Sequence, residues 1–489
     1  MDVLDYDTLY IAGEWRKSSG TDRVTVISPN DEERVGSAPA GTAADVDAAV
    51  AAARSQLAAG GWASWSVQER ASALHRFADR LETVAADVSW RVSAQNGMPI
   101  SMSRGIERFP VQVLRYYADL AEATAADERR LGPDGSVTVV ARDPVGVIAA
   151  IVPWNGPQVQ SMIKIAPALA AGCSVVLKPA PEAMLDSFLL AQAAHESGLP
   201  PGVLSIIPGD GELGAYLVSH PGVDKVSFTG STAAGRLIAA ECGRLIRPVT
   251  LELGGKSAAI VLDDADLGAH LDGFFDATMA MSGQICHLGT RVLVPRSRHR
   301  EMVDAVSDLA SSAVIGESLD PKTRVGPLVS ARQRQRVEDY IELGRAAGAT
   351  ITVGGGRPAG RDTGWFLSPT VFTDVEVDAV IAREEIFGPV LTVIPYRDDD
   401  EAVAIANDSA YGLGGTVWTA DPERGEALAK RISTGTIGVN FYANDPNAPF
   451  GGVRDSGLGR ELGPEGLAAV QVLKSIYVRP GDAQPSQEN

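Results

Sequence analysis

Residues 145–178 read VGVIAAIVPWNGPQVQSMIKIAPALAAGCSVVLK. The first eight residues form an apolar run without polar alternation, which is typical of a parallel strand buried on both faces. Apolar residues at helical spacing then predict a helix over 158–171, and CSVVLK at 173–178 is consistent with a second buried strand. A strand, a helix and a strand in this order form the repeating unit of an α/β sheet.

The same alternation continues to residue 253. The strands VLSII, KVSF and PVTLEL follow, separated by predicted helices near 184–197, 211–219 and 231–242. A second α/β pattern covers residues 256–452, with strands such as RVLVP, VLTVIPY and GTIGVN. Its predicted helices lie near 265–281, 298–314, 332–347, 399–408 and 422–433. This alternation predicts an α/β fold class with two doubly wound domains.

The first 145 residues add helices and a small β segment. Amphipathic helices are predicted over 42–59, 67–95 and 107–126, and Thr42 is a suitable N-cap for the first. Between 127 and 145 a charged turn containing Gly-Pro-Asp-Gly leads into alternating residues. We expect strands there that leave the first domain.

Composition and charge exclude several classes of protein. The chain has 489 residues and a formal net charge of −19, so we expect two or three domains and no general affinity for nucleic acid or anionic membranes. A nucleotide cofactor stays open, because backbone N–H groups and helix dipoles can hold phosphates. The acidic N-terminus does not resemble a signal peptide, and no apolar run approaches the roughly 18 residues of a membrane span. We therefore expect a cytoplasmic protein.

The chain has three cysteines, Cys173, Cys242 and Cys286. Three are too few for a disulfide scaffold and fit a reducing compartment. No spacing typical of zinc ligands is present, so we expect no metal site. Cys173 and Cys242 lie in a buried strand and near a helix end, where small core residues are common. Cys286 follows a glycine at the end of a predicted helix and is a candidate nucleophile.

Three further positions are candidates from the sequence pattern alone. Gly230 and Ser231 lie between a strand and a helix, where free N–H groups could hold a pyrophosphate, although an ordinary serine-capped helix also fits. Glu252 interrupts a hydrophobic strand, and it is either a satisfied structural anion or a base with a raised pKa. Asn155 follows a buried strand directly, and its amide could donate to a developing oxyanion.

Taken together, the motifs resemble the aldehyde dehydrogenase superfamily from Leu9 to Gly463. The motifs, in order, are PWN at 153–155, LKP at 177–179, FTGS at 228–231, LELGGK at 251–256, GQIC at 283–286, EEIFGP at 384–389 and PFGG at 449–452. The resemblance implies two doubly wound α/β domains with a small β oligomerisation element. It implies a homodimer or a homotetramer, since exposed strand edges are best covered by a partner subunit.

The resemblance also implies where the domains begin and end. Residues 1–123 and 145–253 would form the dinucleotide-binding domain. Residues 254–455 would form the catalytic domain, and residues 124–144 and 468–489 the oligomerisation element.

Catalytic roles follow from the same resemblance, position by position. Cys286 matches the nucleophile that attacks an aldehyde to form a thiohemiacetal and then a thioester. Asn155, with the backbone N–H of Cys286, matches the oxyanion hole. Glu252 matches the base that activates the hydrolytic water. Lys164 and Glu461 match a pair associated with proton exit.

The resemblance implies NAD as the cofactor. The matching positions are Val152, Trp154, Lys178, Gly211, Gly230, Ser231, Leu253, Glu385 and Phe387. Many members that prefer NAD carry a glutamate three residues after the lysine, whereas here that position is Pro181 and Glu182 comes one residue later. Without a carboxylate at position 181, the 2′-phosphate of NADP would be repelled less strongly, so the use of NADP stays open.

The substrate tunnel is expected to be wide. Members that act on short aldehydes often carry an aromatic residue after the asparagine, where this chain has Gly156, with Gln160 one turn later. Phe441, Tyr442 and Phe450 are expected at the tunnel mouth. We therefore expect a bulky, aromatic or terpenoid-like aldehyde. The alternatives are a CoA-acylating semialdehyde dehydrogenase, a branch that typically lacks the base Glu252, and a catalytically silent relative.

Overall fold

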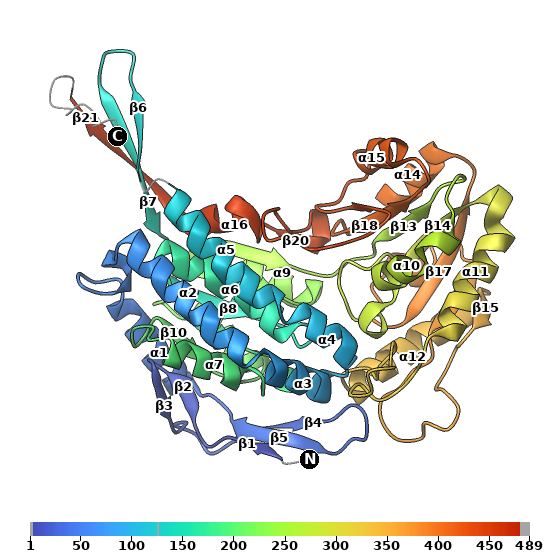
Figure 1. Ribbon diagram of the computed structural model, residues 1–489, viewed down its shortest axis with the longest axis horizontal. Coiled ribbons are helices and arrows are strands. Elements are labelled where there is room, and N and C mark those ends of the chain that lie inside the picture. Colours follow the sequence, from blue (N-terminus) through green and yellow to red (C-terminus); the bar gives the residue numbers. More distant parts are fainter. Residues whose placement is uncertain (1–2, 125–126, 480–489) are drawn as a thin grey trace.

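Two large sheets organise the chain in the computed structural model, which describes residues 3–124 and 127–479 (Figure 1). The first sheet has five parallel central strands and antiparallel strands at both edges. Its strands in spatial order are β20 (Gly457–Leu458), β12 (Val249–Glu252), β11 (Lys225–Thr229), β8 (Val147–Ile151), β9 (Ser174–Lys178), β10 (Leu204–Ile206), β2 (Leu9–Ile11) and β3 (Glu14–Arg16).

Helices cover both faces of the first sheet because its strands carry apolar side chains on both faces. Ile148 and Ala150 of β8 pack in one core, and Val147, Ala149 and Ile151 pack in the other. The first core includes α2 (Val67–Thr83), α5 (Phe109–Ala123), α6 (Pro157–Ala171) and α7 (Ser187–Glu196). The second includes α1 (Ala43–Ser55), α8 (Gly211–Ser219) and α9 (Thr232–Leu245).

The second sheet is parallel except for one antiparallel edge strand. Its strands in spatial order are β15 (Thr350–Val353), β16 (Thr370–Thr373), β17 (Val390–Tyr396), β14 (Arg291–Pro295), β13 (Ala258–Val261), β18 (Gly415–Trp418) and β19 (Gly438–Val439). Around it lie α10 (Leu271–Thr278), α11 (His299–Ser312), α12 (Ala331–Ala346), α13 (Val380–Arg383), α14 (Asp399–Asn407) and α15 (Pro422–Ala429). The predicted fold class of two doubly wound α/β units is confirmed.

Two smaller sheets complete the fold. Strands β1 (Leu4–Asp5), β5 (Arg34–Pro39) and β4 (Arg23–Ile27) form one of them. Strands β21 (Gln471–Val478), β7 (Val137–Pro144) and β6 (Asp127–Leu131) form the other, which projects from the body of the molecule in Figure 1. The predicted strands between 127 and 145 are thereby confirmed. Residues 125, 126 and 480–489 of the predicted oligomerisation element lie outside the described residues.

Several predicted helices are present with different limits. Thr42 is the N-cap of α1, as predicted, and it also forms a reciprocal capping box with Asp45. The predicted helix over 67–95 is two helices, because Val84 leaves helical geometry between α2 and α3 (Ala85–Asn96). The predicted helix over 107–126 begins at Phe109, and α4 (Ile100–Ile106) precedes it. A short α16 (Gly463–Ala468) precedes β21.

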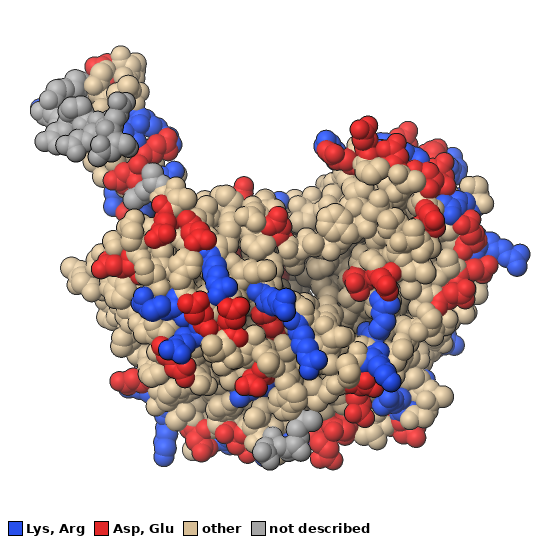
Figure 2. Space-filling model, in the orientation of Figure 1, with Lys and Arg blue, Asp and Glu red and all other residues tan. Residues whose placement is uncertain are grey.

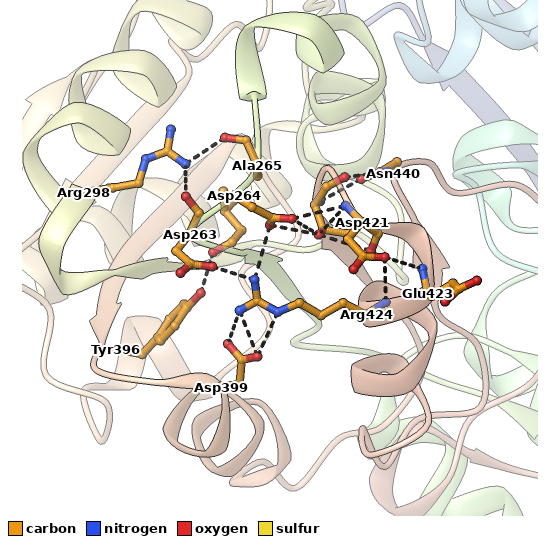
Figure 3. A network of polar contacts seen from close by, with 12 residues as sticks. Asp263, Asp264, Ala265, Arg298, Tyr396, Asp399, Asp421, Glu423, Arg424 and Asn440 are labelled. Carbon is orange, nitrogen blue, oxygen red and sulfur yellow. Dashed lines mark hydrogen bonds and ion pairs between the residues drawn. The ribbon is translucent and has the colours of Figure 1, made fainter.

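A polar network joins the carboxyl ends of the second sheet's strands (Figure 3). Arg424 binds Asp399 at 2.9 Å and Asp263 at 2.6 Å. The Thr419 N–H donates to Asn440 Oδ1 at 2.9 Å, and Asn440 Nδ2 donates to the Thr419 carbonyl at 2.9 Å. Asn440 is thus fixed at the start of the segment that leads back towards the first sheet. No helix in the described residues is long and apolar enough to cross a membrane.

Candidate active site

Two cavities meet at Cys286, Asn155 and Gln160, which line both. The first cavity, of about 1020 Å³, runs past the N-terminus of α9 towards α12, and the second, of about 670 Å³, runs between α4, α5, α6 and the segment after β19. Figure 2 shows a hollow between the two halves of the molecule. Cys286 is therefore reached from two sides.

An irregular segment positions Cys286. The predicted helix over 265–281 ends at Thr278, and Met281 and Ser282 have left-handed φ values of 51° and 55°. Hydrogen bonds fix these turns: the Ser282 hydroxyl donates to the Gly326 carbonyl at 2.7 Å, and Gln284 Oε1 accepts from the Val329 N–H at 3.0 Å. The thiol is thus presented from a loop that is hydrogen-bonded to residues 326–329.

The thiol of Cys286 is half-buried and free. Burial raises the pKa of Cys286 to about 12, and the nearby carboxylates of Glu385 and Glu252 add to this effect because they disfavour a second negative charge. The thiol is therefore protonated at neutral pH in the protein alone.

Asn155 lies in the turn between β8 and α6 and connects the two halves of the site. Its Nδ2 donates to the carbonyl oxygen of Gln284 at 3.0 Å. A side-chain amide has two N–H groups, so one stays available towards the cavities. The sequence analysis expects Asn155 and the backbone N–H of Cys286 to share an oxyanion hole; the structure places Asn155 beside the segment that carries Cys286, and the role itself stays a prediction.

Glu252 ends β12 and is 2% exposed. Neither carboxylate oxygen has a hydrogen-bond partner among the described residues. Burial and the nearby Glu461 raise the pKa of Glu252 well above its usual value, because both disfavour the ionised form. A side chain at Gly451 would lie 2.6 Å from Oε1, so the glycine makes room for the carboxylate. Glu252 lines neither cavity directly.

Lys164 and Glu461 form a buried ion pair beneath the site. Lys164 Nζ lies 2.6 Å from Glu461 Oε1 and 2.6 Å from the Thr229 hydroxyl. The Ser227 hydroxyl donates to the same Glu461 oxygen at 3.1 Å. The pair itself was predicted, but its two hydroxyl partners were not, because nothing in the pattern of β11 separates them from other strand residues.

Most residues expected to bind the cofactor line the first cavity. They are Trp154, Gly230, Ser231, Leu253, Glu385 and Phe387. Val152, Lys178 and Gly211 do not line it. Lys178 is buried and donates to the Gly209 carbonyl at 2.6 Å, and burial lowers its pKa to about 8. Gly211 is the exposed first residue of α8.

The geometry of the first cavity suits an anionic dinucleotide. Ser231 caps α9, its hydroxyl accepting from the Ala234 N–H at 3.3 Å, and the open N-terminus of this 14-residue helix lies at the cavity wall. Glu385 accepts the Gly255 N–H at 2.9 Å, and burial raises its pKa to about 7. Any side chain at Gly254 would collide with Glu385, so the backbone approaches the carboxylate closely.

One wall of the first cavity was missed by sequence reasoning. It comes from α12, through Arg332, Gln333 and Arg336. Gln333 Nε2 donates to the Phe387 carbonyl at 2.7 Å, and Arg336 donates to the Glu385 carbonyl at 2.7 Å. In the sequence this helix has the pattern of an ordinary amphipathic surface helix, so no local signal indicated its role.

The second cavity contains some of the expected substrate residues. Gly156, Gln160, Tyr442 and Phe450 line it. Phe441 does not: this residue is 61% exposed, whereas Tyr442, the next residue, lines the cavity. Much of the remaining wall is apolar and was not predicted, since it comes from distant segments. It includes Met98, Met102, Ile106, Phe109, Ile163, Met281 and Ile285.

Comparison with known families settles which group of proteins this is. The family model described as "Aldehyde dehydrogenase family" matches residues 15–476. The chain belongs to the aldehyde dehydrogenase family. This aldehyde dehydrogenase is similar to the geranial dehydrogenase of Castellaniella defragrans, with 52% identity over 97% of this chain and 99% of the relative. It is 41% identical to the 3-succinoylsemialdehyde-pyridine dehydrogenase of a Pseudomonas species, over 97% and 99% of the two chains.

A solved structure resembles this aldehyde dehydrogenase over the whole chain. The crystal structure of the Mycobacterium tuberculosis aldehyde dehydrogenase complexed with NAD+ superposes with a TM-score of 0.96 at 44% identity. The match covers 99% of this chain and 100% of the other. Within the described residues, no group of three or more His, Cys, Asp or Glu side chains is placed to hold a metal ion.

The burial of the three cysteines predicts which thiol of the aldehyde dehydrogenase reacts first. Cys173 and Cys242 are buried, whereas Cys286 is partly exposed. Iodoacetamide should therefore modify one thiol faster than the other two under native conditions. The thiolate is the reactive form, and the pKa of Cys286 is raised to about 12. At any pH below 12, each increase of one pH unit should therefore raise the labelling rate about tenfold.

Cys286→Ala should remove the fast phase, as measured by mass spectrometry of intact protein. Cys173→Ala and Cys242→Ala serve as controls and should keep it. Equally fast labelling of Cys286→Ala would contradict this assignment.

Proposed function

We propose that this aldehyde dehydrogenase oxidises bulky hydrophobic aldehydes, of aromatic or terpenoid type, to carboxylic acids with NAD. The observation that supports this most is the meeting of two cavities at Cys286 and Asn155. One cavity suits a dinucleotide, and the other has apolar side chains along part of its wall, among them Met102, Phe109 and Ile163. The 52% identity to a geranial dehydrogenase supports a terpenoid-like substrate.

Cys286 is the proposed nucleophile. Its thiol loses a proton to water, and the thiolate forms a C–S bond to the aldehyde carbon while the electron pair of the C=O π bond moves to the substrate oxygen, which gives the thiohemiacetal anion. The free N–H of the Asn155 amide and the backbone N–H of Cys286 stabilise the negative charge that develops on the substrate oxygen. An amide is suited to this role because it donates without titrating.

The first cavity is the proposed NAD site. Ser231 and the N-terminus of α9 would bind the pyrophosphate, and Glu385 would accept ribose hydroxyls. Trp154 and Phe387, whose rings meet edge-to-face at 5.5 Å, would flank the nicotinamide end. NAD, when bound, supplies the hydride acceptor. NAD is favoured over NADP because a similar solved structure is an NAD+ complex, although Pro181 replaces the expected carboxylate.

Glu252 is the proposed base for hydrolysis of the thioester on Cys286. An unpartnered buried carboxylate with a raised pKa can take a proton from water near neutral pH. The buried Lys164–Glu461 pair, at 2.6 Å, is the proposed route by which this proton leaves the site.

Glu252→Gln should uncouple acylation from hydrolysis. Because the pKa of Glu252 is raised, its ionised fraction and therefore the hydrolysis rate should rise with pH. The variant should give a burst of about one NADH per site, while the steady-state rate falls by about 10² or more and loses this pH dependence. Stopped-flow absorbance of NADH without CoA measures both phases.

The exposed Glu426→Gln variant, on α15, is the control and should behave as the wild type. A wild-type enzyme that turns over only when CoA is added would favour a CoA-acylating dehydrogenase instead. No NADH with any aldehyde or cofactor would favour a silent relative.

Gly156 provides the structural reason for a bulky substrate. A Cβ at this position would meet no heavy atom closer than 4.0 Å, so a larger residue would project into the second cavity. We therefore predict a higher kcat/KM for geranial than for acetaldehyde. Gly156→Phe should lower kcat/KM for geranial by at least about tenfold, the effect of losing about 1.4 kcal/mol of binding, with less effect on acetaldehyde.

Gly243→Phe makes the same change on the exposed face of α9 and should affect neither substrate. A wild-type preference for acetaldehyde would overturn the assignment of a bulky substrate.

The projecting sheet is the proposed oligomerisation element of a homodimer or homotetramer. Its strand β21 exposes Val472, Leu473, Ile476 and Tyr477, the last by 82%. An exposed apolar strand favours association with another copy. Sedimentation equilibrium should therefore give a dimer or tetramer that Leu473→Asp dissociates, whereas Leu237→Asp on exposed α9 does not. A monomeric wild type would refute the proposal.

The three free thiols fit the proposed cytoplasmic location.

A further inference from the structure

An aromatic wall adjoins the nucleophile. The imidazole of His287, the residue after Cys286, stacks on the Tyr442 ring with centroids 4.2 Å apart and planes inclined by 15°. Phe450 meets the same imidazole edge-on, at 6.4 Å and 79°. All three side chains line the second cavity, and the sequence places His287 one residue from the reacting thiol.

Contacts with residues 413, 414 and 436 hold the aromatic wall in place. The Tyr442 hydroxyl lies 2.7 Å from the Thr436 hydroxyl, which itself donates to the Leu413 carbonyl at 2.9 Å. A side chain at Gly414 would lie 3.0 Å from the Cβ of His287, so the glycine allows the histidine to lie against the backbone. The plane of the ring pair is therefore fixed by covalent neighbours and by hydrogen bonds.

The wall carries no charge at neutral pH. Burial lowers the pKa of His287 to about 4, because the protonated ring is poorly solvated there. Burial also raises the pKa of Tyr442, so the phenol stays protonated. The imidazole makes no hydrogen bond to any other described residue, so hydrogen bonding does not explain its position. It offers a flat neutral surface beside Cys286.

We propose that His287, held by Tyr442, is a specificity-determining residue that favours aldehydes conjugated with a C=C bond or an aromatic ring over saturated aldehydes of the same skeleton. This inference rests on the proposed function, since it assigns a substrate class to the second cavity.

The geometry explains the selection. The aldehyde carbon must approach the sulfur of Cys286, so the next carbons of the substrate pass the neighbouring residue. A conjugated segment is planar and presents a π face that can stack on the ring pair, whereas tetrahedral carbons cannot follow one plane. The conjugated chain also has fewer rotatable bonds to immobilise on binding. Hydride loss restores a planar carbonyl, so the contact is retained in the thioester.

Cinnamaldehyde and 3-phenylpropanal test this directly, because they differ only in the C2=C3 bond. The wild type should have the higher kcat/KM for cinnamaldehyde. His287→Leu keeps an apolar side chain of similar size but removes the π face. It should lower the cinnamaldehyde to 3-phenylpropanal ratio by about threefold to tenfold, the range of aromatic pair energies.

Two further variants serve as controls for His287→Leu. His75→Leu makes the same change on the surface of α2, where His75 pairs with Asp119, and should leave the ratio unchanged. Tyr442→Phe keeps the stacking partner and should retain most of the preference. An unchanged ratio in His287→Leu, or a wild type without preference, would overturn the inference even if bulky aldehydes are good substrates. Failure of the bulky-over-acetaldehyde comparison would instead overturn the proposed function.

Discussion

The hydrogen bond from Asn155 Nδ2 to the Gln284 carbonyl is the contact on which the site depends. Asn155 lies in the turn that follows β8 of the first sheet, whereas Gln284 belongs to the loop before β14 of the second. A buried hydrogen bond contributes only about 1 kcal/mol net, but losing one partner leaves a buried carbonyl unsatisfied. This contact fixes the distance between the oxyanion donor and the thiol, and it places the junction of the two cavities at Cys286.

The charges around that junction are arranged against local stability. Glu252 has two buried oxygens without partners, and Glu461 has one, among the described residues. Burying a carboxylate oxygen without a partner lowers the stability of the folded protein, and such groups are found mostly where function requires them. Lys164 is hydrogen-bonded to a single Glu461 oxygen. The remaining carboxylate oxygens are thus available to exchange protons, which a fully paired network would not allow.

How much the sequence could predict depended on whether a residue's role was encoded locally. Strand ends followed by Asn155, Ser231 or Glu252 were recognisable, because a turn or a polar residue after a buried strand is itself informative. Arg336 on α12 and Met102 on α4 carried no such signal, because their role arises only when distant helices meet the cavities. Phe441 and Tyr442 were both expected at the tunnel mouth, but only Tyr442 lines the second cavity, because a run of aromatic residues in a loop does not show which of them faces inwards.

The strand order of the first sheet also affects how the protein must be made. The chain leaves this sheet after β12 and returns at β20, which pairs with β12 through Glu252 and Gly457. During synthesis, the nucleophile and the whole second sheet therefore emerge before the last strands do. Until then, Lys164 has no counter-charge from Glu461, β7 has no β21 beside it, and one edge of the first sheet is open. A nascent chain holds its reactive thiol before it holds the ion pair beneath it, so the active site is completed only near the end of translation.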